Sequence, residues 1–357
     1  MLHVTKSFLP DLQEYTAYLQ KIWDSGWITN NGPLVQELEL RIKDRTKANH
    51  LFFCGNGTIV LQMAIKALGL KKEIITTPYS YVATTNAIIW EGCRPVFIDV
   101  NDRDFNIDVD LIENQINENT EAILATHVYG NPCDIERIQK IATKYNLSVI
   151  YDGAHAFGTT LNGESILNAG DITTCSLHAT KLFHSGEGGL LITQDTELAK
   201  TLMLERQFGH VYDDYQLAGI NGKNSELHAA MGLCVLNHLD EIIAHRKHAS
   251  EQYDKKLNLE KLQRPISFTQ IGYNYAYYPV LFKDEQTTIN VKHALEKESI
   301  YPRRYFYPSL NTLPYLGTNQ SCPIAESAAI RVLSLPLSDS ISERDIERVS
   351  EIINKNI

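Results

Sequence analysis

The sequence predicts an α/β protein whose mainly parallel β-sheet is covered by helices on both faces. Short apolar runs alternate with longer segments of helical periodicity, and this alternation is typical of strand–helix–strand units. A length of 357 residues is enough for one large domain and a smaller one. With 43% hydrophobic and 21% charged residues, the composition is that of an ordinary globular enzyme.

The expected elements follow in order from these runs and their boundaries. An extended arm at 4–10 and helices at 11–23 and 34–46 come first, with a loop rich in turn-forming residues at 25–33. Strands are then expected at 51–54, 73–77, 95–99, 122–129, 147–151 and 172–177, and helices at 59–70, 83–90, 108–116, 135–145 and 197–207.

The last third of the chain predicts a second, smaller unit. An apolar-periodic helix extends to about residue 253, and a strand at 275–282 and helices at 290–299 and 343–354 follow it. We therefore expect a large domain over residues 1–245, with the N-terminal arm included, and a small C-terminal domain over residues 246–357.

Charge and cysteine content exclude several classes of function. The formal net charge of −10 argues against a nucleic-acid partner, which needs a basic face. The chain has no apolar run long enough to span a membrane, and its N-terminus lacks the apolar region of a signal peptide. The six cysteines are scattered, without a CxxC pair, which favours reduced thiols over disulfides or a zinc site. We expect a cytoplasmic protein without a metal.

The central stretch, residues 147–189, carries the strongest chemical signal. Asp152 ends the strand expected at 147–151, and ligands of open α/β sheets collect at the carboxyl ends of strands. Lys181 follows the next strand and precedes a glycine-rich loop. A loop lysine and a strand-end carboxylate are what pyridoxal phosphate needs, because the lysine forms an imine with the aldehyde and the carboxylate keeps the pyridine nitrogen protonated. The alternatives are a solvated loop lysine and a turn-forming aspartate.

Two further positions suit the same cofactor. The Gly-Asn-Gly-Thr turn at 55–58 opens a helix, so Gly57 and Thr58 can present free N–H groups to a phosphate. A simple turn with a threonine cap explains that motif as well. Tyr81 follows a strand end, where an aromatic ring can stack on a planar heterocycle, although a packed core tyrosine is the alternative.

These motifs together resemble a known family. The runs DGAHAFG (152–158), GD (170–171), SLHATK (176–181) and GEGG (186–189) are similar to those of the DegT/DnrJ/EryC1/StrS nucleotide-sugar aminotransferases, and the resemblance covers essentially the whole chain. It implies the type I fold of enzymes that depend on pyridoxal 5'-phosphate. That fold has a large domain with a mainly parallel seven-stranded sheet flanked by helices, and a smaller C-terminal α+β domain.

The resemblance also implies roles for single residues. Lys181 is the catalytic lysine, Tyr81 stacks on the cofactor ring, His155 contacts the ring hydroxyl and Ser176 binds the phosphate. Asn221 matches an asparagine that the family donates across a homodimer to the partner's phosphate, so the active sites are shared between chains. The next two residues are Gly and Lys where the family has Tyr and Arg, so a guanidinium contact at this point is in doubt.

Two segments are candidates for substrate binding. The loop at 25–33 brings polar and aromatic side chains to the mouth of the site in the resembled family, but the residues alone also fit a plain connection. The segment at 303–308 combines cations with aromatic rings, which suits a carboxylate, a diphosphate or a sugar ring, although an edge strand is the alternative. The candidates are Trp27, Thr29, Asn30, Arg303, Arg304, Tyr305 and Tyr307.

The function implied by the resemblance is transfer of the amino group of L-glutamate to a nucleotide-ketosugar. RRYFYP (303–308), TNNGP (29–33) and YDGAHAFG (151–158) point to the branch that forms dTDP-4-amino-4,6-dideoxyglucose for surface polysaccharide. Amination at C3, another nucleotide-ketosugar and a regulator with this fold stay open as alternatives. The dehydratase branch has histidine where this chain has Lys181, and a nicotinamide dehydrogenase lacks support because no GxGxxG follows a first strand.

Overall fold

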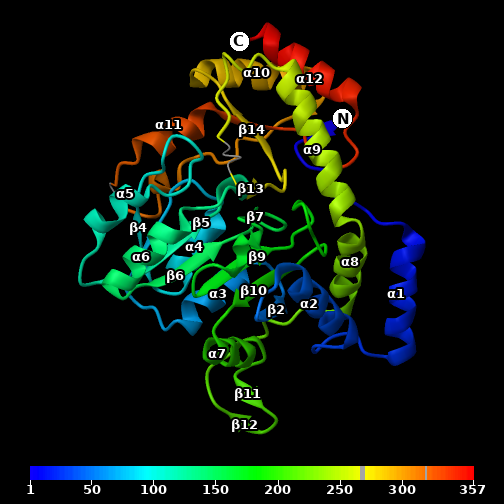
Figure 1. The fold of residues 1–357 in the computed structure, drawn as a ribbon, viewed down its shortest axis with the longest axis vertical. Coiled ribbons are helices and arrows are strands. Elements are labelled where there is room, and N and C mark those ends of the chain that lie inside the picture. Colours follow the sequence, from blue (N-terminus) through cyan, green and yellow to red (C-terminus); the bar gives the residue numbers. More distant parts are fainter. Residues whose placement is uncertain (266–269, 318–319) are drawn as a thin grey trace.

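The computed structural model describes residues 1–265, 270–317 and 320–357, and a seven-stranded sheet forms its centre (Figure 1). The strand order is β2 (His50–Cys54), β10 (Gly189–Thr193), β9 (Ile172–Ser176), β6 (Ser148–Asp152), β5 (Thr120–Thr126), β3 (Glu73–Thr76) and β4 (Arg94–Phe97). Only β10 among these seven runs against its neighbours β2 and β9. The predicted mainly parallel seven-stranded sheet is therefore confirmed.

The sheet is buried on both faces, which explains why its strands are continuous apolar runs. Successive residues of a strand point to opposite faces, so Ile74 packs in one hydrophobic cluster and Ile75 in another. The first cluster lies under α3 (Gly57–Ala67), α4 (Val82–Trp90) and α7 (Thr196–Arg206). The second lies under α5 (Val109–Ile112) and α6 (Ile135–Tyr145).

Four further helices pack beside the sheet or beyond it. The helices α1 (Leu12–Ser25) and α2 (Pro33–Thr46) pack against α8 (Glu226–Asn237), and α9 (Leu239–Lys256) continues from α8 after a break at His238. The sequence predicted one helix across this break. The 3-10 turns are η1 (Glu113–Gln115), η2 (Val128–Gly130), η3 (Ile166–Asn168) and η4 (Leu310–Thr312).

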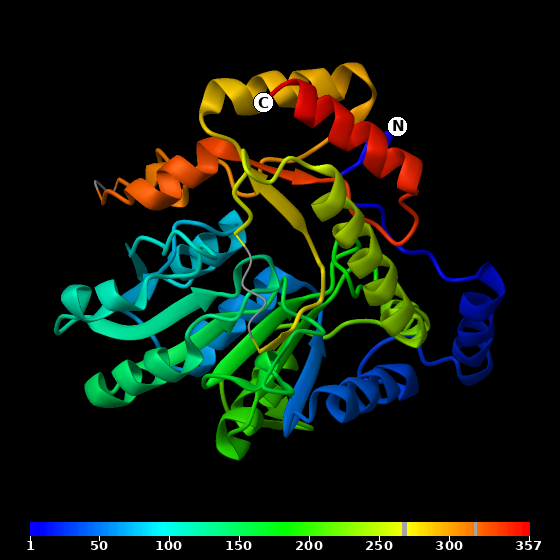
Figure 2. The ribbon, with the colours of Figure 1, turned by 45° about the horizontal axis from the view of Figure 1, so that its top comes forward.

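A second core lies at the C-terminal end of the molecule. The antiparallel strands β14 (Tyr278–Leu281) and β16 (Val332–Leu335) pack with α10 (Glu285–Lys297) and α12 (Glu343–Lys355), which lie side by side in Figure 2. The helix α11 (Pro323–Arg331) leads into β16. The strands β1 (Leu2–His3) and β15 (Ile300–Tyr301) pair in parallel, so the N-terminal arm joins this end of the molecule.

The proposed division at residues 245 and 246 falls inside α9. Ile242, before the division, belongs to the main core, whereas Tyr253, after it, belongs to the C-terminal core. The core therefore changes along α9, but the N-terminal arm pairs with β15 and the main core also takes Leu281 and Val332 from the C-terminal part, so the division into 1–245 and 246–357 stays a proposal.

Small β-structures complete the described fold. The strands β7 (Thr160–Leu161), β8 (Glu164–Ser165) and β13 (Ile271–Gly272) form one small sheet, and β11 (His210–Val211) and β12 (Asp214–Tyr215) form a hairpin that projects from the body (Figure 1). None of the helices in the described ranges is both long and apolar enough to cross a bilayer. The same residues contain no cluster of histidine, cysteine or acidic side chains that could hold a metal ion.

Candidate active site

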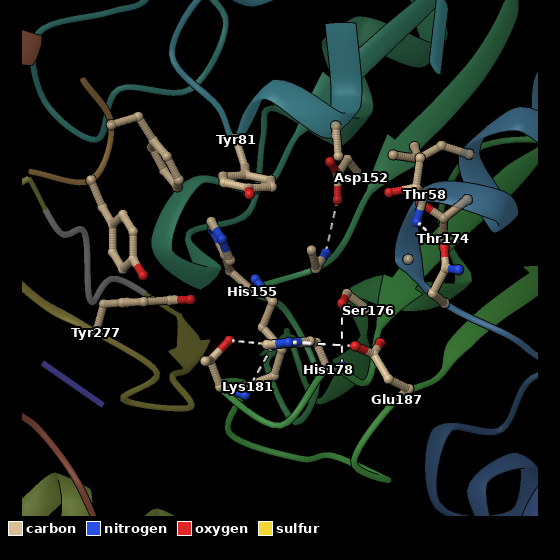
Figure 3. A pocket seen from close by; sticks show the side chains of 18 of the residues that line it. Thr58, Tyr81, Asp152, His155, Thr174, Ser176, His178, Lys181, Glu187 and Tyr277 are labelled. Carbon is tan, nitrogen blue, oxygen red and sulfur yellow. Dashed lines mark hydrogen bonds and ion pairs between the residues drawn. The ribbon is translucent and has the colours of Figure 1, made fainter. Parts of the chain in front are cut away.

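A cavity of about 620 Å³ opens at the carboxyl ends of β6 and β9 (Figure 3). It collects side chains from seven parts of the chain: the turn before α3, the turn before α4, the two strand ends, the loop at 178–187 and two C-terminal segments. Nine of the residues that the sequence predicted for the site line this cavity: Gly57, Thr58, Tyr81, Asp152, His155, Ser176, Lys181, Arg303 and Tyr305.

Asp152 is the last residue of β6, and its carboxylate is buried and held by two donors. The Thr84 hydroxyl donates to its Oδ2 at 2.7 Å, and the Ala154 backbone N–H donates to its Oδ1 at 3.0 Å. The Thr84 hydroxyl also lies 2.8 Å from the Ser80 hydroxyl, so the carboxylate belongs to a buried polar network. This network fixes the direction in which Asp152 faces the cavity.

Lys181 lies across the cavity from Asp152, five residues beyond the end of β9. Burial alone would lower the pKa of its ammonium group. The Tyr277 hydroxyl and the negative charge of Asp152 outweigh burial, so the pKa of Lys181 lies above its ordinary value. Tyr277 lies next to the start of β14 and lines the same cavity. Nothing in the sequence around Tyr277 marks it as a site residue, so it was not predicted.

His155 is buried among aromatic rings and is neutral. Its Nδ1 accepts the backbone N–H of Tyr129 at 3.2 Å, so its proton is on Nε2. The ring stacks on Phe306 with centroids 5.3 Å apart and an interplanar angle of 6°. Burial, and then the nearby charge of Lys181, place the pKa of His155 well below its ordinary value. The residue therefore offers a hydrogen-bond donor without a charge.

The opposite end of the cavity has the features of an anion site. Gly57 begins α3 so close to Ser176 that a Cβ atom at position 57 would lie 2.8 Å from the Ser176 Oγ. Thr58 and Ser176, which each carry a hydroxyl group, both line the cavity. Asn56 caps α3, because its Oδ1 accepts the N–H groups of Thr58 at 3.0 Å and of Ile59 at 2.9 Å. A phosphate here would share or replace these cap contacts at the positive end of the helix.

These donors and acceptors fit pyridoxal phosphate. An amine, a fixed carboxylate and a pair of hydroxyls at a helix N-terminus surround one space, and Gly57 leaves room where any side chain would collide. Tyr81 caps α4 and remains 59% exposed, so its ring is free to cover a planar ligand (Figure 3). His178 and Glu187, whose Nε2 and Oε1 atoms are 3.6 Å apart, also line the cavity. Neither residue was predicted to have a role in the site.

The side chains of residues 303–307, which follow β15, lie in two different environments. Arg303 and Tyr305 line the cavity. Arg304 turns away: it donates to Glu285 at 2.9 Å and to the carbonyl of Ile330 at 3.0 Å, and its guanidinium group stacks on the Tyr307 ring. Arg304 and Tyr307 were also predicted for the site, but neither lines the cavity in this chain.

The other predicted residues lie outside the cavity of their own chain. Trp27, Thr29 and Asn30 are in an exposed loop that leads into α2, whose N-terminus is capped by the Glu226 carboxylate. Asn221 is exposed at the base of the projecting hairpin, where it pairs with Gln207.

Known proteins resemble this chain over nearly its full length. A 37% identical protein of Shigella dysenteriae, dTDP-4-amino-4,6-dideoxy-D-glucose transaminase, matches 99% of this chain and 98% of its own length. GDP-perosamine synthase of Escherichia coli O157:H7 is 31% identical, over 95% of this chain and 94% of the relative.

Solved structures and a family model agree with these relatives. DesI, crystallised with its TDP-sugar product, is 32% identical and superposes with a TM-score of 0.94 over 99% of this chain and 92% of its own. The aminotransferase TlmJ from Streptoalloteichus hindustanus is 25% identical, with a TM-score of 0.93 over 100% of this chain and 98% of its own. The model of the DegT/DnrJ/EryC1/StrS aminotransferase family matches residues 11–354. The chain therefore belongs to this family of pyridoxal-phosphate-dependent aminotransferases.

Proposed function

We propose that this protein transfers the amino group of L-glutamate to the C4 keto group of dTDP-4-keto-6-deoxy-D-glucose, giving dTDP-4-amino-4,6-dideoxy-D-glucose for surface-polysaccharide (O-antigen) synthesis. The observation that carries the proposal is the placement of Lys181 and Asp152 in one cavity. The name of the 37% identical relative from Shigella dysenteriae supports the choice of sugar and of carbon atom.

The chain's own residues divide the work of the reaction. When bound, pyridoxal phosphate supplies an electron sink for the carbanion next to the transferred nitrogen. Asp152 would hold the charge on the ring nitrogen, and Ser176, Thr58 and the backbone of Gly57 would hold the phosphate. The Nζ of Lys181 removes the proton from Cα of glutamate and later delivers a proton to C4 of the sugar.

The remaining wall of the cavity faces the substrates. The Tyr81 ring would cover the bound cofactor, and the Nε2–H of His155 would donate to the cofactor's ring oxygen. Arg303, beside Tyr305, offers a guanidinium group that suits both substrates in turn, because glutamate carries carboxylates and the nucleotide sugar carries a diphosphate.

The test is incubation of the loaded enzyme with glutamate and a panel of nucleotide sugars that have a keto group at C3 or C4. We expect amination of the dTDP-4-ketosugar, with the new nitrogen placed on C4 by NMR and 2-oxoglutarate formed in equal amount. Conversion of a 3-ketosugar alone would refute the choice of carbon. A Lys181→Ala variant that turned over normally would refute the mechanism, and a wild-type protein that binds the cofactor without any turnover would indicate a regulator.

We also propose that the active enzyme is a homodimer in which each site receives Asn221 from the other chain. Large apolar side chains are exposed on and beside the hairpin that carries this residue: Trp90 at 82%, Phe208 at 49%, Tyr212 at 90%, Tyr215 at 74% and Ile220 at 41%. Apolar surface of this kind is typical of subunit contacts. Two of these residues, Trp90 and Ile220, also line a groove of about 420 Å³.

Mixed dimers test this arrangement directly. Consider a heterodimer of a Lys181→Ala chain and an Asn221→Ala chain. If each active centre takes Lys181 from one chain and Asn221 from the other, one centre contains neither substitution and the other contains both. We expect mixing to recover up to half of the wild-type rate per heterodimer, although each parent is impaired. If Asn221 serves its own chain, neither centre is intact and mixing recovers nothing.

A cytoplasmic location remains part of the proposal. All six cysteines are buried and free, which is typical of proteins in a reducing compartment. Cell fractionation with an antibody to the protein would test the location.

A further inference from the structure

Tyr277 occupies an unusual position in the cavity. It comes from the segment before β14, more than ninety residues after Lys181 in the sequence, yet both residues line the same cavity and the Tyr277 hydroxyl points toward Lys181 (Figure 3). The residue is only 6% exposed. A buried tyrosine hydroxyl usually finds a hydrogen-bond partner, and the Tyr277 hydroxyl is also one of the groups that raise the pKa of Lys181.

The Tyr277 ring is fixed by the aromatic side chains around it. It meets the edge of the His155 ring with centroids 4.8 Å apart and the Tyr305 ring with centroids 5.9 Å apart, at angles of 67° and 89°. Both neighbours line the same cavity. These contacts leave the ring little freedom to turn, so the position of its hydroxyl is defined.

The backbone on the N-terminal side of Tyr277 is fastened as well. The side-chain amide of Asn274 donates to the carbonyls of His155 at 2.7 Å and Phe157 at 2.9 Å. The carbonyl of Ala276 accepts a hydrogen bond at 3.0 Å from Arg246, a buried residue of α9. The segment is thus tied both to the loop after β6 and to a helix. Support of this kind is what a site needs to hold a group to within a fraction of an ångström.

The Lys181 side chain, in contrast, has no such rigidity of its own. A lysine has a flexible four-carbon stem, and its amine must act first at Cα of one substrate and then at C4 of another. A misplacement of about 1 Å can cost about a hundredfold in rate. A fixed hydroxyl beside the amine removes much of this freedom.

We propose that Tyr277 is a positioning residue whose hydroxyl holds the Lys181 amine in place while that amine is free of the cofactor. The inference rests on the proposed function, because it assumes that Lys181 carries the proton in both halves of the reaction. The Tyr277 hydroxyl itself exchanges no proton with the substrate.

The test compares Tyr277→Phe with Tyr278→Phe. The first variant removes the hydroxyl beside Lys181 and keeps the ring. The second makes the same chemical change one residue later, where the hydroxyl donates to Asp254 at 2.7 Å instead. Tyr277→Leu serves if the first variant does not fold.

The first readout uses the cofactor-free protein and does not depend on turnover. We would measure the rate at which an amine-selective acylating reagent modifies Lys181 as a function of pH, with peptide mapping by mass spectrometry. Without the Tyr277 hydroxyl the ammonium form loses a stabilising contact, so half-maximal modification should move to lower pH in Tyr277→Phe and stay at the wild-type value in Tyr278→Phe.

The second readout is steady-state kinetics of the loaded enzyme. We expect kcat of Tyr277→Phe to fall about tenfold to a hundredfold, with both KM values within about twofold of wild type. An unchanged pH of modification, or a rise in KM with kcat unchanged, would overturn the proposal, because Tyr277 would then contact the substrate or only fill space. If the wild-type enzyme aminates no ketosugar, the proposed function fails, whereas the modification profile still decides the contact with Lys181.

Discussion

Replacement of Gly57 by alanine tests the geometry of the proposed phosphate site. A Cβ atom at position 57 would lie 2.7 Å from the Ser176 Cβ and 3.3 Å from its Cα. Turning the serine side chain relieves neither contact, since both atoms move only with the backbone of β9. Overpacking of this kind typically costs about 1–3 kcal/mol.

That cost has to appear either in folding or in binding. If the clash strains the cofactor-free protein, that protein melts at a lower temperature. If instead the end of β9, with Ser176, shifts without cost in the free protein and must return when the phosphate binds, the same 1–3 kcal/mol weakens binding, which raises Kd about fivefold to 150-fold. The loss of folding stability and the loss of binding free energy should together equal the overpacking cost of about 1–3 kcal/mol.

Gly55→Ala is the matched control for stability. At position 55, in the same turn, an added Cβ atom meets only the carbonyl of Lys223, at 3.9 Å, which is an ordinary contact. We would record thermal melts without the cofactor and titrate pyridoxal phosphate by its absorbance. A Gly57→Ala protein that matches wild type in both its melting temperature and its Kd would refute this prediction, because the close approach of Gly57 to Ser176 would then have no energetic consequence.

Three more predictions follow from buried polar groups. Thr84→Val keeps the side-chain volume but removes the donor to Asp152, so we expect a loss of about 1.5–3 kcal/mol in stability, visible as a lower melting temperature than that of Thr84→Ser. The pKa of His155 is depressed, so its NMR signals should not titrate between pH 5.5 and 8; a midpoint in that range would contradict a neutral ring. Burial raises the pKa of Glu205 to about 7, so the folded protein holds a proton between pH 4.5 and 7 that the unfolded chain releases. Wild type should therefore lose stability as the pH rises through this range, and Glu205→Gln should melt at the higher temperature at pH 8; equal pH profiles would contradict this.

The sequence predicted those parts of the fold and site that depend on local signals. Asp152 and Lys181 could be found because each follows an apolar run that ends at a turn, and such ends gather at one edge of a parallel sheet. Gly57 could be found from the glycine-rich turn that opens α3. All three line one cavity.

Other features could not be predicted because they depend on distant parts of the chain. The strand β10 is a buried apolar run like its neighbours, and nothing within it shows that it runs antiparallel to them. Tyr277 is one of 18 tyrosines, and only the return of the chain after α9 brings it to Lys181. The pair Arg303 and Arg304 illustrates the same limit, because the sequence cannot say which of two adjacent cations in an extended segment faces inward.

The groups proposed to hold the cofactor and those proposed to face the sugar come from different parts of the fold. The groups proposed to hold the cofactor come from the central sheet and the turns at its edge, where any shift would disturb two buried cores. The residues proposed to face the sugar, Arg303 and Tyr305, belong instead to a segment outside that sheet, which pairs with β16 at Ser334. Substitutions there can reshape the acceptor side without moving Asp152 or Lys181. Because Tyr277 reaches Lys181 from the same C-terminal side, the proposed small domain would set both the acceptor and the position of the amine that serves it.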